Sequence, residues 1–161
     1  MKILVLSDTH LTTDTQLPAR LIQELGEADL IIHAGDWSSL HGHDLLKMYA
    51  PVKGVYGNAD HTDILNTFPK KELLTINGFR IGIVHGHGSK KTTERRAFEA
   101  FADENVDAII FGHSHIPYLR YFKKILLLNP GSPTNKRTQP YYSFAILHLD
   151  EVIRTEFVFF E

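Results

Sequence analysis

Polar side chains that bind metals follow apolar runs at five places in this sequence. The five stretches are Ser7-Asp8-Thr9-His10, Ala34-Gly35-Asp36, Tyr56-Gly57-Asn58, Val84-His85-Gly86-His87 and Phe111-Gly112-His113-Ser114-His115. Aspartate, asparagine and histidine are side chains that bind hard or borderline divalent cations. Because an apolar run that ends in polar residues is typical of a strand exit, the five stretches indicate one shared metal site.

Each stretch taken alone has an ordinary structural explanation. An aspartate after a strand, such as Asp8, is commonly a turn residue or a helix cap, and Gly57-Asn58 is commonly a turn. The two histidine-rich stretches could be surface loops. The combination is far more specific than any part, because each stretch occupies the same topological place at the end of an expected strand.

The number of candidate ligands indicates two metal ions rather than one. The candidates are Asp8, His10, Asp36, Asn58, His85, His113 and His115. A structural zinc uses about four protein ligands and a catalytic one about three, so this set exceeds the need of one ion. Two divalent cations also bring more positive charge than two aspartates cancel, which leaves a surplus for a hydroxide and an anionic substrate. Two ions roughly 3.5–4 Å apart are used in phosphoryl transfer.

Strands and helices that alternate along the first third of the chain must carry these residues. Strands are expected at residues 3–6, 30–32 and 52–56, and helices at residues 17–25 and 40–50. The apolar runs are typical of strands buried on both faces, while Gly26 and Pro51 end the two helices. The alternation predicts a βαβαβ unit with a parallel sheet, whose ligands lie beyond the carboxyl ends of the strands.

The backbone at these strand exits is expected to bring the donors together. Within Asp8-Thr9-His10 and His113-Ser114-His115 the donors are two residues apart, and extended backbone would direct both side chains of each pair to the same side. The glycines at positions 35, 57, 86 and 112 would allow tight turns and close approach of the backbone.

The second half of the chain is expected to be richer in strands. The dipeptide Asn77-Gly78 is a strong hairpin signal between strands at residues 72–76 and 79–84. A helix is expected at residues 92–105, and further strands at residues 108–111, 118–122, 125–128, 141–149 and 152–159. Parallel units followed by hairpins predict two packed sheets with helices outside, in a single domain over residues 1–161.

The composition fits a soluble globular protein and excludes several classes of site. With 161 residues, of which 43% are hydrophobic and 22% charged, the chain can bury the core of one domain. A formal net charge of -2 argues against nucleic-acid binding, and the absence of cysteine excludes thiolate metal sites and cysteine nucleophiles. The N-terminal apolar run is too short for a signal peptide, and no run reaches the ~20 residues of a membrane helix. We therefore expect a cytoplasmic protein.

The order of the five stretches resembles the signature of the calcineurin-like metallophosphoesterases. The short length and the segment Asn129-Pro130-Gly131-Ser132 resemble the small single-domain bacterial and archaeal phosphodiesterase branch of that superfamily. The resemblance extends from Met1 to about Ser132, and the final strands fit its β-sandwich. It implies an α/β (α+β) fold, a four-layer αββα sandwich of two mixed β-sheets flanked by helices.

The resemblance also implies a dinuclear phosphodiesterase with a ligand set for each ion. Asp8, His10 and His115 would hold one ion, Asn58, His85 and His113 the other, and Asp36 would bridge them. A hydroxide that bridges the ions would attack phosphorus in line, without a covalent enzyme intermediate. The cofactors would be two divalent ions, Mn²⁺ first, with Fe²⁺, Zn²⁺, Ni²⁺ or Mg²⁺ as alternatives. The substrate would be a small phosphate ester.

One position departs from the pattern of the family. Many members have histidine directly after the motif asparagine, where it protonates the leaving group, and here that position is Ala59. His61 and His87 are the candidate replacements, and Asp60 could orient a neighbouring ligand. The expected catalytic residues are Asp36, Asn58, His87 and Asp60. Without the usual acid, activity is expected first on activated aryl phosphodiesters.

Several alternatives stay open. A non-catalytic protein-binding scaffold of the retromer-subunit type resembles the same branch, but such scaffolds lose ligand histidines that this chain retains. A phosphomonoesterase or a nucleotide hydrolase could use the same metals. The aromatic segment at residues 157–160 leaves a homodimer or homotetramer open, and Lys136 and Arg137 could reach the substrate.

Overall fold

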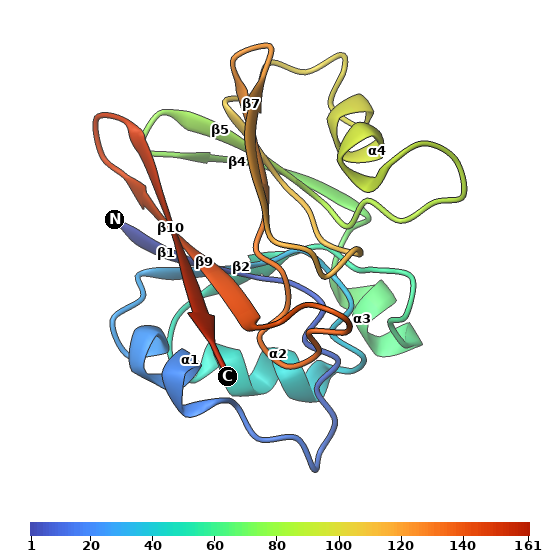
Figure 1. Cartoon of the computed structure of the whole chain (residues 1–161), viewed down its shortest axis with the longest axis vertical. Helices are drawn as coiled ribbons and strands as arrows, with labels where there is room; N and C mark the ends of the chain where they lie inside the picture. The colour runs from blue at the N-terminus through green and yellow to red at the C-terminus, as the bar shows by residue number, and fades with distance from the viewer.

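Two mixed sheets form the centre of the computed structural model, which describes residues 1–161. The first five-stranded sheet has the spatial order β10 (Ile153–Phe160), β9 (Tyr142–Leu149), β1 (Lys2–Leu6), β2 (Leu30–His33) and β3 (Val52–Gly54). The second five-stranded sheet has the order β4 (Lys71–Ile76), β5 (Phe79–Val84), β6 (Ala108–Ile110), β8 (Ile125–Asn129) and β7 (Tyr118–Phe122). In Figure 1 the second sheet lies above the first.

The first sheet contains the expected βαβαβ unit. Strands β1, β2 and β3 pair in parallel, and helices α1 (Ala19–Leu25) and α2 (Leu40–Lys47) connect them. The hairpin of β9 and β10 completes this sheet, because β9 pairs antiparallel with β1. In the second sheet the predicted hairpin of β4 and β5 is present, β5, β6 and β8 run parallel, and β7 pairs antiparallel with β8 at the edge.

Three separate hydrophobic clusters define four layers. The central cluster lies between the sheets and includes Ile3 and Ile110. A second cluster joins the other face of the first sheet to α1 and α2, and a third joins the second sheet to α4 (Thr93–Glu99). Alternate residues of a strand point to opposite faces, so Ile3 and Leu4 of β1 belong to different clusters. The αββα sandwich expected from the sequence is therefore confirmed (Figure 1).

The helices are shorter than predicted. Helix α2 ends at Lys47 instead of residue 50, and bonds between residues three apart continue it as a tight turn, including Met48 N–H to the Leu45 carbonyl. Helix α4 ends at Glu99 instead of residue 105, and bonds between residues three apart continue it as tight turns, including Phe101 N–H to the Phe98 carbonyl. None of the helices has the length and apolarity to cross a membrane.

The segment after β3 differs most from the prediction. Strand β3 ends at Gly54 instead of residue 56, because the Tyr56 N–H bonds to the Pro69 carbonyl and leaves the sheet. The short helix α3 (Thr62–Thr67) was not expected from the sequence. It buries Ile64 alone, so its sequence shows no apolar stripe by which a helix could be recognised.

Candidate metal centre

The candidate ligands lie in loops beyond strands of both sheets. Asp8 and His10 follow β1, Asp36 follows β2, Asn58 follows β3, His85 follows β5, and His113 and His115 follow β6. Two groups have donor atoms within 4.8 Å of one another, namely Asp8 with His10 and His115, and Asp8 with Asp36 and His85. Loops from two facing sheets therefore build one cluster around Asp8.

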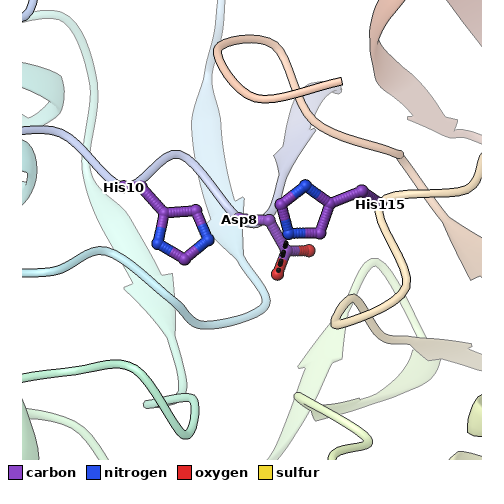
Figure 2. A group of neighbouring side chains, drawn as sticks. All are labelled: Asp8, His10 and His115. Carbon is purple, nitrogen blue, oxygen red and sulfur yellow. Dashed lines mark ion pairs between the residues drawn. The ribbon is translucent and has the colours of Figure 1, made fainter. Parts of the chain in front are cut away.

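Asp8 is the centre of the first group. Figure 2 shows its carboxylate next to the imidazole ring of His115, with the His10 ring nearby; the centroids of the two rings are 5.4 Å apart. Asp8 Oδ1 lies 3.4 Å from His115 Nε2. The other oxygen, Oδ2, accepts hydrogen bonds from the Ser7 hydroxyl at 2.8 Å and from the His113 backbone N–H at 2.9 Å. These bonds fix the carboxylate and leave Oδ1 directed at the cluster.

Asp36 belongs to the second group and also lies near His10 of the first. Its Oδ2 is 3.3 Å from His85 Nε2 and 3.8 Å from His10 Nε2, while Oδ1 accepts the Ala59 backbone N–H at 2.8 Å. Burial acts to raise the pKa of Asp36, but the neighbouring His85 ring and its charge hold the pKa well below its usual value. An ionised carboxylate that faces donors on both sides has the position that a bridging ligand needs.

The backbone of the donors is curled rather than extended. The φ angles are 54° at Asp8, 44° at His10, 58° at Asp36, 69° at His113 and 59° at His115. The extended backbone predicted for the two paired stretches is therefore wrong. Aspartate and histidine are among the residues that enter this left-handed region most readily, and such strain collects at functional sites.

Two glycines are required by the close approach of the loops. A Cβ at Gly57 would collide with Asp36 Oδ1, and a Cβ at Gly112 would collide with the Ser7 hydroxyl and lie 2.7 Å from Asp8 Oδ2. Neither neighbour can move without displacing a candidate ligand. The glycines predicted to allow close approach thus do so directly against the two carboxylates.

Hydrogen bonds from two histidines fix which ring nitrogen faces the cluster. His85 Nδ1 lies 2.7 Å from the Ala34 carbonyl, and His115 Nδ1 bonds to the Asn135 carbonyl. A carbonyl only accepts, so each Nδ1 carries the proton and each Nε2 presents a lone pair when the ring is neutral. This arrangement is the usual one for a metal-binding histidine, because it sets the tautomer and the ring orientation.

Buried polar atoms without a partner mark where a cation fits. Asp8 Oδ1, His10 Nε2, His85 Nε2 and His115 Nε2 are buried and form no hydrogen bond. Leaving such groups unpaired is costly, by about 1–3 kcal/mol each or more for charged groups. One carboxylate oxygen and three imidazole nitrogens that converge are a suitable donor set for a divalent transition metal. The residues present therefore fit the metals expected from the sequence.

The two remaining candidates lie at the outer side of the cluster. The His113 ring stands edge-on to His85 with centroids 5.3 Å apart. Its Nδ1 is 3.1 Å from Oδ1 of Asn58, whose side chain is exposed. The structure thus places His113 beside His85, with Asn58 bonded to His113.

Asp60 holds the loops of the site rather than facing the cluster. Its carboxylate accepts the backbone N–H groups of Asp36 at 3.1 Å, Ser38 at 2.8 Å and Gly57 at 2.7 Å. It therefore ties the loop after β2 to the loop after β3, which carries Asn58. His61 follows directly, is exposed, and forms the N-cap of α3.

Sequence reasoning missed the side chains that fasten the loop after β8. The Ser132 hydroxyl donates to the Asp8 carbonyl at 2.8 Å and accepts the Asn135 N–H at 2.8 Å. The Thr134 hydroxyl donates to the Thr9 carbonyl. The sequence feature that could have indicated them is the Asn129-Pro130-Gly131-Ser132 segment. It suggested a branch of the family, but no role for any of its residues.

His87 lies beside the cluster, near the start of the loop after β5. Its ring centroid is 5.5 Å from that of His85 and 6.4 Å from that of His113. Its Nδ1 is buried and unpaired. Arg96 holds this loop through a bond from Nε to the Gly86 carbonyl at 2.7 Å. His87 thus has a ring nitrogen without a hydrogen-bond partner, close to His85 and His113.

Metal affinity is expected to fall as the pH decreases through about 6. Burial raises the pKa of Asp8 to about 6. Burial acts to lower the pKa of His85, but the neighbouring carboxylates of Asp36 and Asp8 raise it overall. Asp8 gains a proton as the pH falls through about 6, and His85 gains one more readily than an ordinary histidine. Metal ions need both groups unprotonated, so each competing proton should weaken binding about tenfold per pH unit.

Titration with Mn²⁺, followed by the electron paramagnetic resonance of the free ion at pH 5, 6 and 7.5, checks this expectation. Burial lowers the pKa of His113 and His115 to about 4, so these rings do not begin the loss. Equal dissociation constants at pH 5 and pH 7.5 would contradict a site built from Asp8 and His85.

Comparison with known proteins identifies one family over most of the chain. A family model described as the calcineurin-like phosphoesterase superfamily domain matches residues 1–152. A probable metallophosphoesterase of Methanocaldococcus jannaschii is 38% identical over 160 residues, which are 98% of this chain and 81% of that protein.

Two solved structures share the fold. Chaetomium thermophilum Vps29 gives a TM-score of 0.80 at 20% identity and covers 99% of this chain and 97% of its own. A structure described as a novel archaeal phosphodiesterase gives a TM-score of 0.75 at 21% identity, over 99% of this chain and 100% of its own. At these identities the likeness concerns the fold alone.

Proposed function

The chain belongs to the calcineurin-like phosphoesterase superfamily, and on that premise we propose that it is a dinuclear metal-dependent phosphodiesterase for small phosphate esters. The observation that carries the proposal is the convergence of four buried, unpaired donor atoms from Asp8, His10, His85 and His115. Buried polar atoms are normally paired, so a cluster without partners favours bound cations over a structural role.

The ligands divide between two ions. Asp8, His10 and His115 would hold one ion, Asn58, His85 and His113 would hold the other, and Asp36 would lie between them; the first of these sets is a group of converging donor atoms in the structure. When bound, the ions supply Lewis-acid activation of the phosphoryl group and of a water nucleophile. Mn²⁺ is the first candidate, because mixed carboxylate, amide and imidazole ligands suit it, with Fe²⁺, Zn²⁺, Ni²⁺ and Mg²⁺ as alternatives.

His87 acts as the proton donor in this proposal, because Ala59 occupies the position where many family members have the donor histidine. Its unpaired Nδ1 lies beside His85 and His113, whereas His61 is exposed at the start of α3. Burial lowers the pKa of His87 in the free protein. A bound phosphate places a negative charge beside the ring and favours its protonated form, from which the proton passes to the leaving oxygen.

Replacing His87 should affect substrates according to their leaving group. His87→Ala should slow hydrolysis of an alkyl phosphodiester by about 10²-fold, since general acid catalysis is worth about that much or more. The para-nitrophenolate group of an aryl ester leaves without protonation, so hydrolysis of that ester should be slowed little. His61→Ala is the matched control and should affect neither ester. Equal losses with both esters in His87→Ala would contradict the assignment.

Asp60 acts through the loops that it holds. By accepting the N–H groups of Asp36 and Gly57 it sets the position of the Asp36 side chain and of the neighbouring Asn58. Mutation of residues that orient metal ligands in this way typically lowers metal affinity or activity by about 10–100-fold. Asp60 is therefore a positioning residue in this proposal.

The complete donor set favours catalysis over a protein-binding scaffold. A scaffold would have no need to keep buried nitrogen and oxygen atoms unpaired, since such atoms destabilise the fold. The fold alone does not distinguish the two functions, because both can be built on one architecture.

The deciding experiment is a comparison of two esters by the protein loaded with Mn²⁺. The kcat/KM for bis-para-nitrophenyl phosphate should exceed that for para-nitrophenyl phosphate by at least about tenfold, a difference of ~1.4 kcal/mol between the transition states. A higher kcat/KM for the monoester would replace the proposal by a phosphomonoesterase. Full metal occupancy without turnover of either ester would favour the scaffold.

A further inference from the structure

The loop after β8, at residues 130–141, is fastened to the metal cluster. Ser132 donates to the Asp8 carbonyl, Thr134 donates to the Thr9 carbonyl, and His115 Nδ1 donates to the Asn135 carbonyl. Three bonds thus anchor this loop to both stretches that form the first ligand group. The residues directly after Asn135 therefore lie close to that group.

Arg137 is the second residue after this anchor. Its backbone has a φ of 49°, and its side chain is exposed and forms no hydrogen bond or ion pair. The preceding Lys136 is used elsewhere, because its Nζ bonds to the Pro140 carbonyl at 3.1 Å and lies 5.1 Å from the Tyr142 ring centroid. Of the two cations in this loop, only Arg137 is free to bind something.

The anchor of the loop places Arg137 near the first ligand group. Asn135, whose carbonyl accepts the bond from His115 Nδ1, precedes Arg137 by two residues. The exposed guanidinium pairs with no carboxylate, so its charge is available to an anion bound at the cluster.

We propose that Arg137 is a substrate-binding residue, whose guanidinium holds a non-bridging oxygen of a phosphate group on the His10 and His115 side of the cluster. This inference rests on the proposed function and extends it to how the substrate is oriented. A guanidinium presents paired N–H donors in a plane that matches two phosphate oxygens, which an ammonium group cannot reproduce.

The test compares Arg137→Ala and Arg137→Lys with Lys136→Ala as the matched control, all in the full chain loaded with Mn²⁺. Two quantities are measured, namely the KM for bis-para-nitrophenyl phosphate and the Kd for inorganic phosphate by calorimetry. Arg137→Ala should raise both by about tenfold or more, the size expected for a lost bond between charged groups. Arg137→Lys should lie between, and Lys136→Ala should match the wild type.

Metal analysis of the same variants separates substrate binding from structure. Unchanged Mn²⁺ content in Arg137→Ala is expected. Arg137→Ala values equal to those of Lys136→Ala, or a loss of Mn²⁺ in Arg137→Ala, would overturn the inference. If the wild type hydrolyses no phosphate ester, the proposed function fails, while the phosphate titration still decides whether Arg137 binds the anion.

Discussion

Replacement of Asp36 by alanine is expected to remove both metal ions and reduce phosphodiester turnover by at least about 10³-fold. Asp36 Oδ2 faces His85 Nε2 at 3.3 Å and His10 Nε2 at 3.8 Å, so it lies near ligands assigned to both ions, as Asp8 does. Metal ions supply several kcal/mol of transition-state stabilisation, and each ~1.4 kcal/mol is a factor of ten in rate.

The measurement is metal content by mass spectrometry together with kcat/KM for an aryl phosphodiester. Asp36→Asn is the informative companion, because it keeps the acceptor for the Ala59 N–H and removes the charge that the ions require. Asp14→Ala, which removes an exposed carboxylate, should leave both quantities unchanged. Full turnover in Asp36→Ala would show that the reaction does not use this cluster.

Chelation of the wild-type protein is expected to abolish turnover and lower the Tm by roughly 8–16 °C, with both restored by Mn²⁺. Binding at about 1,000 times the Kd stabilises the folded state by about 4 kcal/mol, and each kcal/mol shifts the Tm of a chain of this size by about 2–4 °C. The origin of the shift lies in the unpaired donor atoms and in Asp8, whose pKa is raised mainly by burial and further by the charge of Asp36.

Calorimetric scans with chelator and with Mn²⁺ check the shift. Asp36→Ala is the control, because its Tm should respond to Mn²⁺ far less than that of the wild type. An identical Tm for metal-free and metal-loaded protein would contradict the view that the cluster is a cation site. Turnover that persists after chelation has removed all metal would contradict the proposed reaction as well.

Local patterns in the sequence predicted most of the elements. The apolar runs of β1 and β2 and the Asn77-Gly78 turn are features of a few neighbouring residues, and each produced the expected strand or hairpin. Helix α3 had no such feature, since it buries only Ile64. Prediction succeeded where a pattern of burial repeats along the chain and failed where a segment is too short to repeat.

Local patterns could not predict the backbone of the site. The spacing of Asp8 and His10 suggested extended backbone, yet both residues are left-handed. Their conformation depends on bonds to distant residues, among them the His113 N–H to Asp8 Oδ2 across 105 positions. The spacing of two residues along the chain contains no information about such a distant partner.

The sequence by itself determined the types of the donors, their places at the exits of strands and the four-layer architecture, because side-chain chemistry and burial period are properties of short segments. Only the tertiary structure decided which nitrogen of His85 and His115 faces the cluster, that Asp60 binds backbone instead of the centre, and that Arg137 is free while Lys136 is not. Each of these depends on hydrogen bonds and charges whose partners become neighbours when the loops pack. The Ser132–Asp8 bond, which spans 124 positions, is of this kind.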